Sequence, residues 1–172
     1  MLSYKQLLPA ITTFIFDVDG VITDGQILLI NNEIIRSINS RDAFAIQHAA
    51  KNGYKIFVIT GGKSQDVKDC LLNLGVNEVF LKSSNKLEVY KALQEREGFR
   101  NEEVLYMGDD LPDLPTLQIV GVSTCPQDAA SEVKAMVHYQ SPYNGGRFAV
   151  RDVIEQTMKV QNKWITSGTY IW

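Results

Sequence analysis

The sequence of 172 residues has little of what marks membrane-bound or disulfide-stabilised proteins. Its longest apolar-leaning runs, such as residues 11–16 and 56–59, are far shorter than the roughly 20 residues that a membrane-spanning helix requires. The two cysteines, Cys70 and Cys125, form neither a CxxC pair nor a disulfide framework, which favours two reduced thiols. We therefore expect no membrane segment and no disulfide bond.

The sequence also lacks a lysine and arginine cluster, a strong net charge and a secretion signal. Its 17 basic and 20 acidic residues give a net charge of −3, so nothing predicts capture of nucleic acid or binding to a membrane surface. The N-terminus does not combine a basic region with an apolar core and a cleavage site, so we expect a cytoplasmic protein. With 45% hydrophobic and 22% charged residues, residues 1–172 have the composition and length of a single globular domain.

Apolar, β-prone runs alternate with amphipathic helical stretches along most of the chain. Strands are predicted at residues 11–16, 55–59, 78–81, 104–107 and 120–123. Helices are predicted at residues 40–52, 64–75, 84–97, 113–119, 127–135 and 147–160, with Ser40 and Ser64 as the first two N-caps. This alternation is typical of an α/β fold: a doubly wound, mostly parallel, Rossmann-like sheet with helices on both faces.

Two segments do not fit this alternation. The runs 26–30 and 34–38 flank Asn31-Asn32-Glu33, which predicts a β-hairpin over about residues 25–38 whose apolar faces lack cover. Because the hairpin and one helix fill the chain between Asp19 and Thr60, no cap domain is expected there. The C-terminal tail, residues 161–172, should be docked because it carries many large apolar side chains: Trp164, Ile165, Tyr170, Ile171 and Trp172.

The ends of the predicted strands carry polar side chains that suit metal and phosphate binding: Asp17, Asp19, Thr60, Lys86, Asp109, Asp110 and Asp113. In an open parallel sheet, ligands collect beyond the carboxyl ends of the strands, so we expect these side chains to converge. Crowded carboxylates repel one another unless a hard cation neutralises them. An all-oxygen cluster suits Mg²⁺, which keeps waters and accepts substrate phosphate. The pattern therefore predicts a site for Mg²⁺ and a phosphate group.

Each of these residues also has an ordinary explanation when it is taken alone. Asp17 can start a loop, since Asp-x-Asp-Gly is a common turn, and Thr60 before two glycines can shape another turn. Lys86 can be a solvated helix residue. The joint occurrence of all of them, in this order and at strand ends, favours the functional interpretation.

Four motifs carry a resemblance to a known family: residues 16–21 (Phe-Asp-Val-Asp-Gly-Val), residues 59–61 (Ile-Thr-Gly), Lys86, and residues 108–113 (Gly-Asp-Asp-Leu-Pro-Asp). Through them the sequence resembles the haloacid dehalogenase superfamily of phosphohydrolases over about residues 11–158. More narrowly, it is similar to the capless branch typified by 3-deoxy-D-manno-octulosonate 8-phosphate phosphatases. The closer similarity lies in Asp24-Gly25, Arg41-Asp42, Gly145-Gly146-Arg147 and Ala149-Val150-Arg151.

The resemblance implies a phosphatase that works through an aspartyl-phosphate. Asp17 would attack phosphorus, and Asp19 would protonate the departing oxygen and then take a proton from water. Mg²⁺ would be held by the Asp17 carboxylate, the Asp19 backbone carbonyl and Asp109.

The resemblance assigns the other motif residues to the phosphate and its surroundings. The Thr60 hydroxyl, the Gly61 backbone N–H and the Lys86 ammonium would receive the phosphate oxygens. Asp110 would orient metal-bound water, and Asp113 would pair with Lys86 to fix its position.

Three positions depart from the pattern of the branch. Gly62 stands where relatives commonly carry a long charged side chain, and Ala43 and Phe148 stand where glycine is expected. These departures leave the chemical core intact and bear on the substrate. Three basic residues, each equally plausible as a surface charge, are candidates for binding a sugar-acid carboxylate: Arg41, Lys63 and Arg147.

The function that the resemblance implies is Mg²⁺-dependent hydrolysis of a phosphorylated 3-deoxy-2-keto sugar acid, such as 3-deoxy-D-manno-octulosonate 8-phosphate, for lipopolysaccharide synthesis. A phosphatase for another small phosphorylated metabolite is the alternative that Gly62 favours. A phosphorylatable receiver domain would place its acidic pair first and its phosphorylated aspartate on a later strand, which this sequence does not. A catalytically silent subunit is disfavoured because the motif residues are intact.

The resemblance also implies a homotetramer in which hairpins associate and a neighbour's C-terminal segment closes the active site. The apolar hairpin and the aromatic tail agree with this. The alternative is that both pack within their own subunit.

Overall fold

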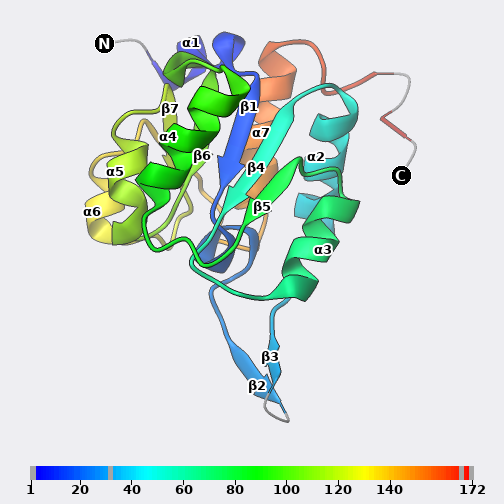
Figure 1. Ribbon diagram of the computed structural model, residues 1–172. Helices are drawn as coiled ribbons and strands as arrows, with labels where there is room; N and C mark the ends of the chain where they lie inside the picture. Colours follow the sequence, from blue (N-terminus) through cyan, green and yellow to red (C-terminus); the bar gives the residue numbers. More distant parts are fainter. Residues whose placement is uncertain (1–2, 31–32, 167–168, 171–172) are drawn as a thin grey trace.

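A computed structural model describes residues 3–30, 33–166 and 169–170 of the chain (Figure 1). Its centre is a six-stranded sheet in the order β5-β4-β1-β6-β7-β8, in which every neighbouring pair runs parallel. The strands of this sheet are β1 (Thr13–Phe16), β4 (Lys55–Ile59), β5 (Glu78–Phe80), β6 (Val104–Met107), β7 (Val122–Cys125) and β8 (Tyr139–Gln140). The predicted doubly wound α/β fold is confirmed.

Seven α-helices lie among the described residues: α1 (Tyr4–Leu7), α2 (Ser40–Lys51), α3 (Gln65–Asn73), α4 (Lys86–Glu97), α5 (Leu114–Leu117), α6 (Ser131–Lys134) and α7 (Ala149–Val160). Short 3₁₀ turns occur at Leu8–Ala10, Asn101–Glu103 and Leu111–Asp113, and an irregular helical turn follows β1 at Val18–Ile22. The longer helices separate successive parallel strands, as right-handed crossover connections require.

The side chains of β1 alternate between two hydrophobic cores, one on each face of the sheet. Phe14 and Phe16 pack in the core that α2, α3 and α7 cover, whereas Ile15 packs in the core that α4, α5 and α6 cover. Because consecutive side chains of a strand point to opposite faces, a central strand buried on both faces must be apolar throughout. This explains the continuous apolar run at residues 14–16, which is fully buried.

The structure differs from the sequence-based prediction at several boundaries. Asn39, not Ser40, caps α2, and its side chain accepts a hydrogen bond from the Arg41 backbone N–H. The strand predicted at 120–123 lies two residues later, as β7, and the helix predicted at 127–135 is reduced to the four residues of α6. The short elements α1 and β8 were not predicted. Four-residue and two-residue elements are too short to show a periodic pattern.

The predicted hairpin is formed by β2 (Leu28–Ile30) and β3 (Glu33–Ile35), which pair antiparallel in a sheet of their own. Figure 1 shows the hairpin projecting from the end of the molecule where the strands of the main sheet have their carboxyl ends. The predicted turn at Asn31-Asn32 lies outside the described residues. Six large apolar side chains on the hairpin are 41 to 75% exposed: Ile27, Leu28, Leu29, Ile30, Ile34 and Ile35.

The C-terminal tail begins at the opposite end of the molecule (Figure 1). Trp164 is buried against α2, where its ring meets Phe44 and His48 edge-on and its carbonyl accepts a hydrogen bond from His48 Nε2 at 2.9 Å. Ile165 and Tyr170 are exposed. The docking expected for the tail therefore holds for Trp164 and not for these two, while Ile171 and Trp172 lie outside the described residues.

Candidate active site

A cavity of about 440 Å³ lies at the carboxyl ends of β1, β4 and β6. The register of the sheet builds it, because Phe16 pairs with both Val58 and Met107, so the residues that follow the three strands emerge side by side. The structure brings together in its lining all the motif residues that the sequence singled out: Asp17, Asp19, Thr60, Gly61, Lys86, Asp109, Asp110 and Asp113.

Lys86 lies at the bottom of this cavity between two carboxylates. It is the first residue of α4, which Asn85 caps by accepting a hydrogen bond from the Glu88 N–H. Its Nζ is 2.6 Å from Asp17 Oδ2 and 2.7 Å from Asp113 Oδ1. Burial by itself lowers the pKa of Lys86, but the two carboxylates outweigh burial and raise it, so the ammonium stays charged.

Asp113 is fully buried, and both of its carboxylate oxygens are occupied. Oδ1 accepts hydrogen bonds from Lys86 and from the Tyr106 hydroxyl at 2.7 Å, and Oδ2 accepts longer ones from the Asp109 and Asp110 backbone N–H groups. Asp113 thus ties Lys86 to the loop after β6. Sequence reasoning missed Tyr106. The available signal was a tyrosine in a fully buried strand, whose hydroxyl must find a partner.

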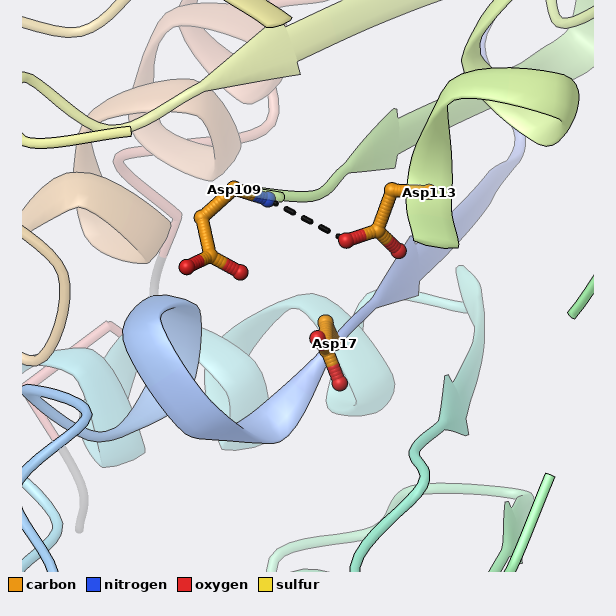
Figure 2. A group of neighbouring side chains, drawn as sticks. All are labelled: Asp17, Asp109 and Asp113. Atoms are coloured by element: carbon orange, nitrogen blue, oxygen red, sulfur yellow. Dashed lines mark hydrogen bonds between the residues drawn. The ribbon is translucent and has the colours of Figure 1, made fainter. Parts of the chain in front are cut away.

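Asp17, Asp109 and Asp113 surround a common space, as Figure 2 shows. One carboxylate oxygen from each lies within 4.8 Å of the others. Burial, followed by the neighbouring carboxylates, raises the pKa of Asp17 to about 6 and that of Asp109 to about 7. The ammonium of Lys86 lies between Asp17 and Asp113, so the three carboxylates carry more negative charge than this one cation offsets.

The donor set fits Mg²⁺. Asp113 is saturated by hydrogen bonds, whereas the Asp109 carboxylate accepts none from the described residues, so Asp17 and Asp109 are the carboxylates that can bind a cation. Gly20, with a φ of 82°, makes room for Asp109, because a Cβ at Gly20 would overlap the Asp109 carboxylate. Hard carboxylate oxygens in a small number are typical of magnesium sites.

Asp19 has a different environment from Asp17, although only one residue separates them. Its carboxylate is one-third exposed and forms a bidentate ion pair with Arg36: Nε lies 2.6 Å from Oδ1 and Nη2 lies 3.0 Å from Oδ2. The Thr23 hydroxyl is 3.3 Å from Oδ1. Sequence reasoning missed Arg36 as well. It directly follows β3, and no motif marks it.

The loop after β4 contributes Thr60 and the two glycines that follow it. Thr60 is buried, and its hydroxyl accepts a hydrogen bond from the Gly62 backbone N–H at 3.0 Å. The Thr60 carbonyl accepts another from the Ser83 N–H at 2.9 Å, which links this loop to the segment before α4. The Thr60 side chain is therefore held at the cavity wall.

The three basic residues expected to bind a sugar acid do not line this cavity. Lys63 lies in a neighbouring groove between the hairpin and α3, Arg147 is exposed and lies 3.8 Å from Asp24, and Arg41 lines a separate cavity beside α7. The Arg41 guanidinium stacks over the Phe148 ring. Arg36, which was not one of the three candidates, does contact a motif carboxylate, that of Asp19.

The two positions where glycine was expected behave differently. Phe148 has a φ of 83°, in the left-handed region that favours glycine, just before α7. Its backbone N–H donates to Asp42 Oδ2 at 3.0 Å. Ala43 lies in the first turn of α2, where the backbone is helical. The backbone conformation therefore explains why glycine would be expected at position 148, but it does not explain the expectation at position 43.

Known proteins resemble the chain over most of its length. A family model for haloacid dehalogenase-like hydrolases matches residues 73–154, which include Lys86 and Asp109 but not Asp17 or Thr60. The 3-deoxy-D-manno-octulosonate 8-phosphate phosphatase KdsC of Escherichia coli K12 is 36% identical over 154 residues, which are 89% of this chain and 82% of that protein.

Solved structures give the same result. A 3-deoxy-D-manno-octulosonate 8-phosphate phosphatase from Yersinia pestis matches with a TM-score of 0.90 and 33% identity, covering 93% of this chain and 87% of the other. The Moraxella catarrhalis phosphatase of the same name, in complex with a magnesium ion, a phosphate ion and a KDO molecule, matches with a TM-score of 0.89, 29% identity and 92% coverage of each chain.

The described helices, taken one by one, are each too short or too polar to cross a membrane. The fold, the convergence of the four motifs and the identity to curated relatives agree. The chain belongs to the haloacid dehalogenase-like hydrolases, in the group that includes the 3-deoxy-D-manno-octulosonate 8-phosphate phosphatases.

Proposed function

We propose that the chain is a Mg²⁺-dependent phosphatase that hydrolyses 3-deoxy-D-manno-octulosonate (KDO) 8-phosphate, an acidic sugar phosphate used in lipopolysaccharide synthesis. The observation that carries the proposal is the convergence of Asp17, Lys86 and Asp109 on one cavity. The names of the related phosphatases supply the substrate. Both cysteines are free thiols, which supports a reducing, cytoplasmic location.

Asp17 is the proposed nucleophile. One of its carboxylate oxygens forms a bond to phosphorus while the bond between phosphorus and the sugar oxygen breaks, which leaves an aspartyl-phosphate. The carboxylate is buried and held from both sides: Oδ1 accepts from the Val18 backbone N–H at 2.6 Å and Oδ2 from Lys86. This fixes its orientation before the substrate arrives.

Mg²⁺ would be held by the carboxylates of Asp17 and Asp109 and the backbone carbonyl of Asp19. When bound, the ion offsets the repulsion between the nucleophile and the phosphate and neutralises charge that develops during transfer. The raised pKa values of Asp17 and Asp109, caused first by burial and then by neighbouring carboxylates, support this assignment, since a bound cation would offset both.

Asp19 is the proposed proton donor and acceptor. It gives a proton to the departing sugar oxygen, and its carboxylate then takes one from the water that attacks the aspartyl-phosphate. That water forms a bond to phosphorus and releases Asp17 and inorganic phosphate. The partial exposure of Asp19 supports this role, because the group that serves both the sugar and the water must face the open side of the cavity.

The phosphate oxygens would be received by the Thr60 hydroxyl, the Gly61 backbone N–H and the Lys86 ammonium. Asp113 positions Lys86. Asp110, which is exposed at the rim and caps the next turn through the Leu111 N–H, would orient the attacking water. Of the three basic candidates for the sugar acid, Lys63 is nearest in the fold, since it follows Gly62; Arg41 and Arg147 would have to act from outside this cavity.

We also propose that the chain assembles as a homotetramer through its hairpins. The exposed apolar side chains of the hairpin support an interface there. The described part of the tail starts at the far end of the subunit from the cavity, which supports closure by the tail of a neighbouring copy. Light scattering after size-exclusion chromatography tests the assembly, and a monomer near 19.3 kDa would contradict it.

The function is tested by phosphate release from KDO 8-phosphate, glucose 6-phosphate and nucleoside monophosphates, each with Mg²⁺ and with EDTA. We expect Mg²⁺-dependent release that is fastest from KDO 8-phosphate and is abolished by Asp17→Asn. The matched control is Asp69→Asn, which changes an exposed acidic residue of α3 that lines neither the cavity nor the neighbouring groove and accepts a hydrogen bond from Gln65. A faster reaction with another metabolite would contradict the proposed substrate but not the phosphatase activity. Full activity of Asp17→Asn would contradict the role of Asp17 as the nucleophile.

A further inference from the structure

Arg36 joins the hairpin to the active site. It is the first residue after β3, and its side chain is 8% exposed although the apolar side chains of the strand before it are exposed. Through Nε and Nη2 it holds both oxygens of Asp19. A buried guanidinium therefore lies next to the group proposed to protonate the sugar oxygen.

The same guanidinium lies next to the space that Gly62 leaves open. A Cβ at Gly62 would lie 3.6 Å from Asp19 Oδ2 and 3.9 Å from Arg36 Nη2. A long side chain at position 62 would thus start within contact distance of this ion pair. In this chain, position 62 has no side chain that could carry a charge. The positive charge at this place comes from Arg36, which follows the hairpin.

Gly62 also connects two hollows. It lines the cavity that contains Asp17, and it lines a groove of about 1000 Å³ between the hairpin and the start of α3, which Arg36 and Lys63 line too. A leaving group that extends from the phosphate into this groove passes Arg36. The charged residues among those that line the groove are Arg36, Lys63 and Asp66.

The Arg36 guanidinium has donors left over. Asp19 uses two of its five N–H donors, and Nη1 makes no hydrogen bond with the described residues. A planar fork of this kind binds a carboxylate with two parallel hydrogen bonds and can exchange one carboxylate for another.

We propose that Arg36 is the residue that selects an acidic leaving group: it holds Asp19 in the free enzyme and binds the carboxylate of the sugar acid when the substrate enters. This exchange releases Asp19 toward the sugar oxygen. The proposal rests on the proposed phosphatase function and adds to it the residue that reads the substrate. A phosphate whose sugar has no carboxylate leaves the Arg36–Asp19 ion pair intact and is hydrolysed more slowly.

The test compares KDO 8-phosphate with glucose 6-phosphate, whose sugar carries no carboxylate, in the wild type, Arg36→Met and Arg36→Lys. In Arg36→Met both reactions slow, because Asp19 loses its partner, but KM for KDO 8-phosphate rises about tenfold to hundredfold, the range for a charged hydrogen-bonded contact, and KM for glucose 6-phosphate changes much less. Arg36→Lys keeps part of the preference, since it keeps the charge but not the fork.

Two further variants separate recognition from folding. Arg36→Met/Gly62→Arg places a guanidinium in the same space from the other side and should restore at least part of the lost preference. Arg100→Met, which changes an exposed arginine paired with Glu103, should leave the preference unchanged. Melting temperatures of all variants show whether a loss of activity reflects unfolding.

Two outcomes are decisive. Equal losses with both substrates in Arg36→Met, which leave the preference unchanged, would reduce Arg36 to a positioning residue for Asp19; this result overturns the proposal and leaves the phosphatase standing. A wild type that hydrolyses both phosphates without preferring the acidic one would overturn the proposed substrate and the role of Arg36 together.

Discussion

The active-site cavity has two sides that differ in how the protein holds them. On the strand side, Asp17, Lys86 and Asp113 are buried and joined by hydrogen bonds of 2.6 and 2.7 Å. On the hairpin side, Asp19 is one-third exposed and its partner Arg36 directly follows a two-stranded sheet that forms no part of the main sheet.

The difference follows from how each side is built. The register of β1 with β6 places Asp17 beside the loop that carries Asp109, and the Asp17 N–H donates to the Met107 carbonyl at 3.1 Å. No such ladder fixes Arg36. The strand side is therefore suited to the phosphoryl transfer itself, and the hairpin side to selecting what is cleaved.

The largest effect that separates the two sides should come from Lys86→Met. It removes the proposed phosphate ligand and leaves two buried carboxylates unpaired, so we expect kcat to fall about 10²- to 10³-fold and the free energy of unfolding to fall by about 3 kcal/mol. Kinetics and urea unfolding measure both. Lys55→Met, which breaks the exposed pair with Glu97, is the control and should change neither by much.

If Lys86→Met lost activity and kept full stability, the strand side would not be a rigid unit. Both sides of the cavity would then hold their charges loosely.

The second effect concerns pH and Mg²⁺. The pKa of Asp109, about 7, lies above the ordinary value for an aspartate, so the stability that its protonated form contributes is present at low pH and is lost as the pH rises through 7. Without metal, we expect the protein to lose about 2 kcal/mol between pH 5.5 and pH 8, which corresponds to the pKa interval from 5.5 to 7.

The measurement is the melting temperature in EDTA and in Mg²⁺ at both pH values. We expect a drop of about 5 °C in EDTA at pH 8 and its recovery with Mg²⁺, since metal binds the ionised carboxylates. Asp109→Asn should remove most of the pH dependence, leaving the part that comes from Asp17, and should remove the response to Mg²⁺. A melting temperature in EDTA that does not change with pH would contradict the crowding of charge on the strand side.

A smaller effect is expected from Tyr106→Phe, which removes one of the hydrogen bonds that hold Asp113. We expect a loss of about 1 kcal/mol in unfolding free energy and a several-fold lower kcat with little change in KM, because Lys86 is held less firmly. Tyr90→Phe is a matched control: its hydroxyl binds Asn101 at 2.7 Å in the same core but away from the cavity. It should cost similar stability and leave kcat unchanged.

The two sides also differ in how far the sequence predicts them. The strand side was predictable, because parallel strands bring their carboxyl ends to one edge and Asp17, Thr60, Lys86 and Asp109 all follow strands or begin the next helix. Tyr106 was not predicted, because its hydroxyl binds Asp113, and the position of Asp113 is set by the turn at Leu111–Asp113 and not by a hydrophobic periodicity of the sequence.

Arg36 was not predicted for a different reason. Its contact with Asp19 spans 17 residues and depends on the angle at which the hairpin leaves the sheet, which no pattern in the sequence encodes. The cap of α2 shows the same limit on a smaller scale. Asn39 and Ser40 are both good N-caps, and only the backbone conformation decides that Asn39, with extended φ and ψ, is the cap.

The smallest effect tests a position where sequence and conformation disagree. Phe148 adopts a φ of 83°, which costs about 1 kcal/mol for a residue with a Cβ, and its ring meets Tyr143 edge-on and lies under Arg41. Phe148→Ala loses the ring contacts and keeps the strain, whereas Phe148→Gly loses the contacts and relieves it. We therefore expect the glycine variant to be more stable than the alanine variant by about 1 kcal/mol in urea unfolding, and equal stabilities would mean that the turn before α7 relaxes without cost.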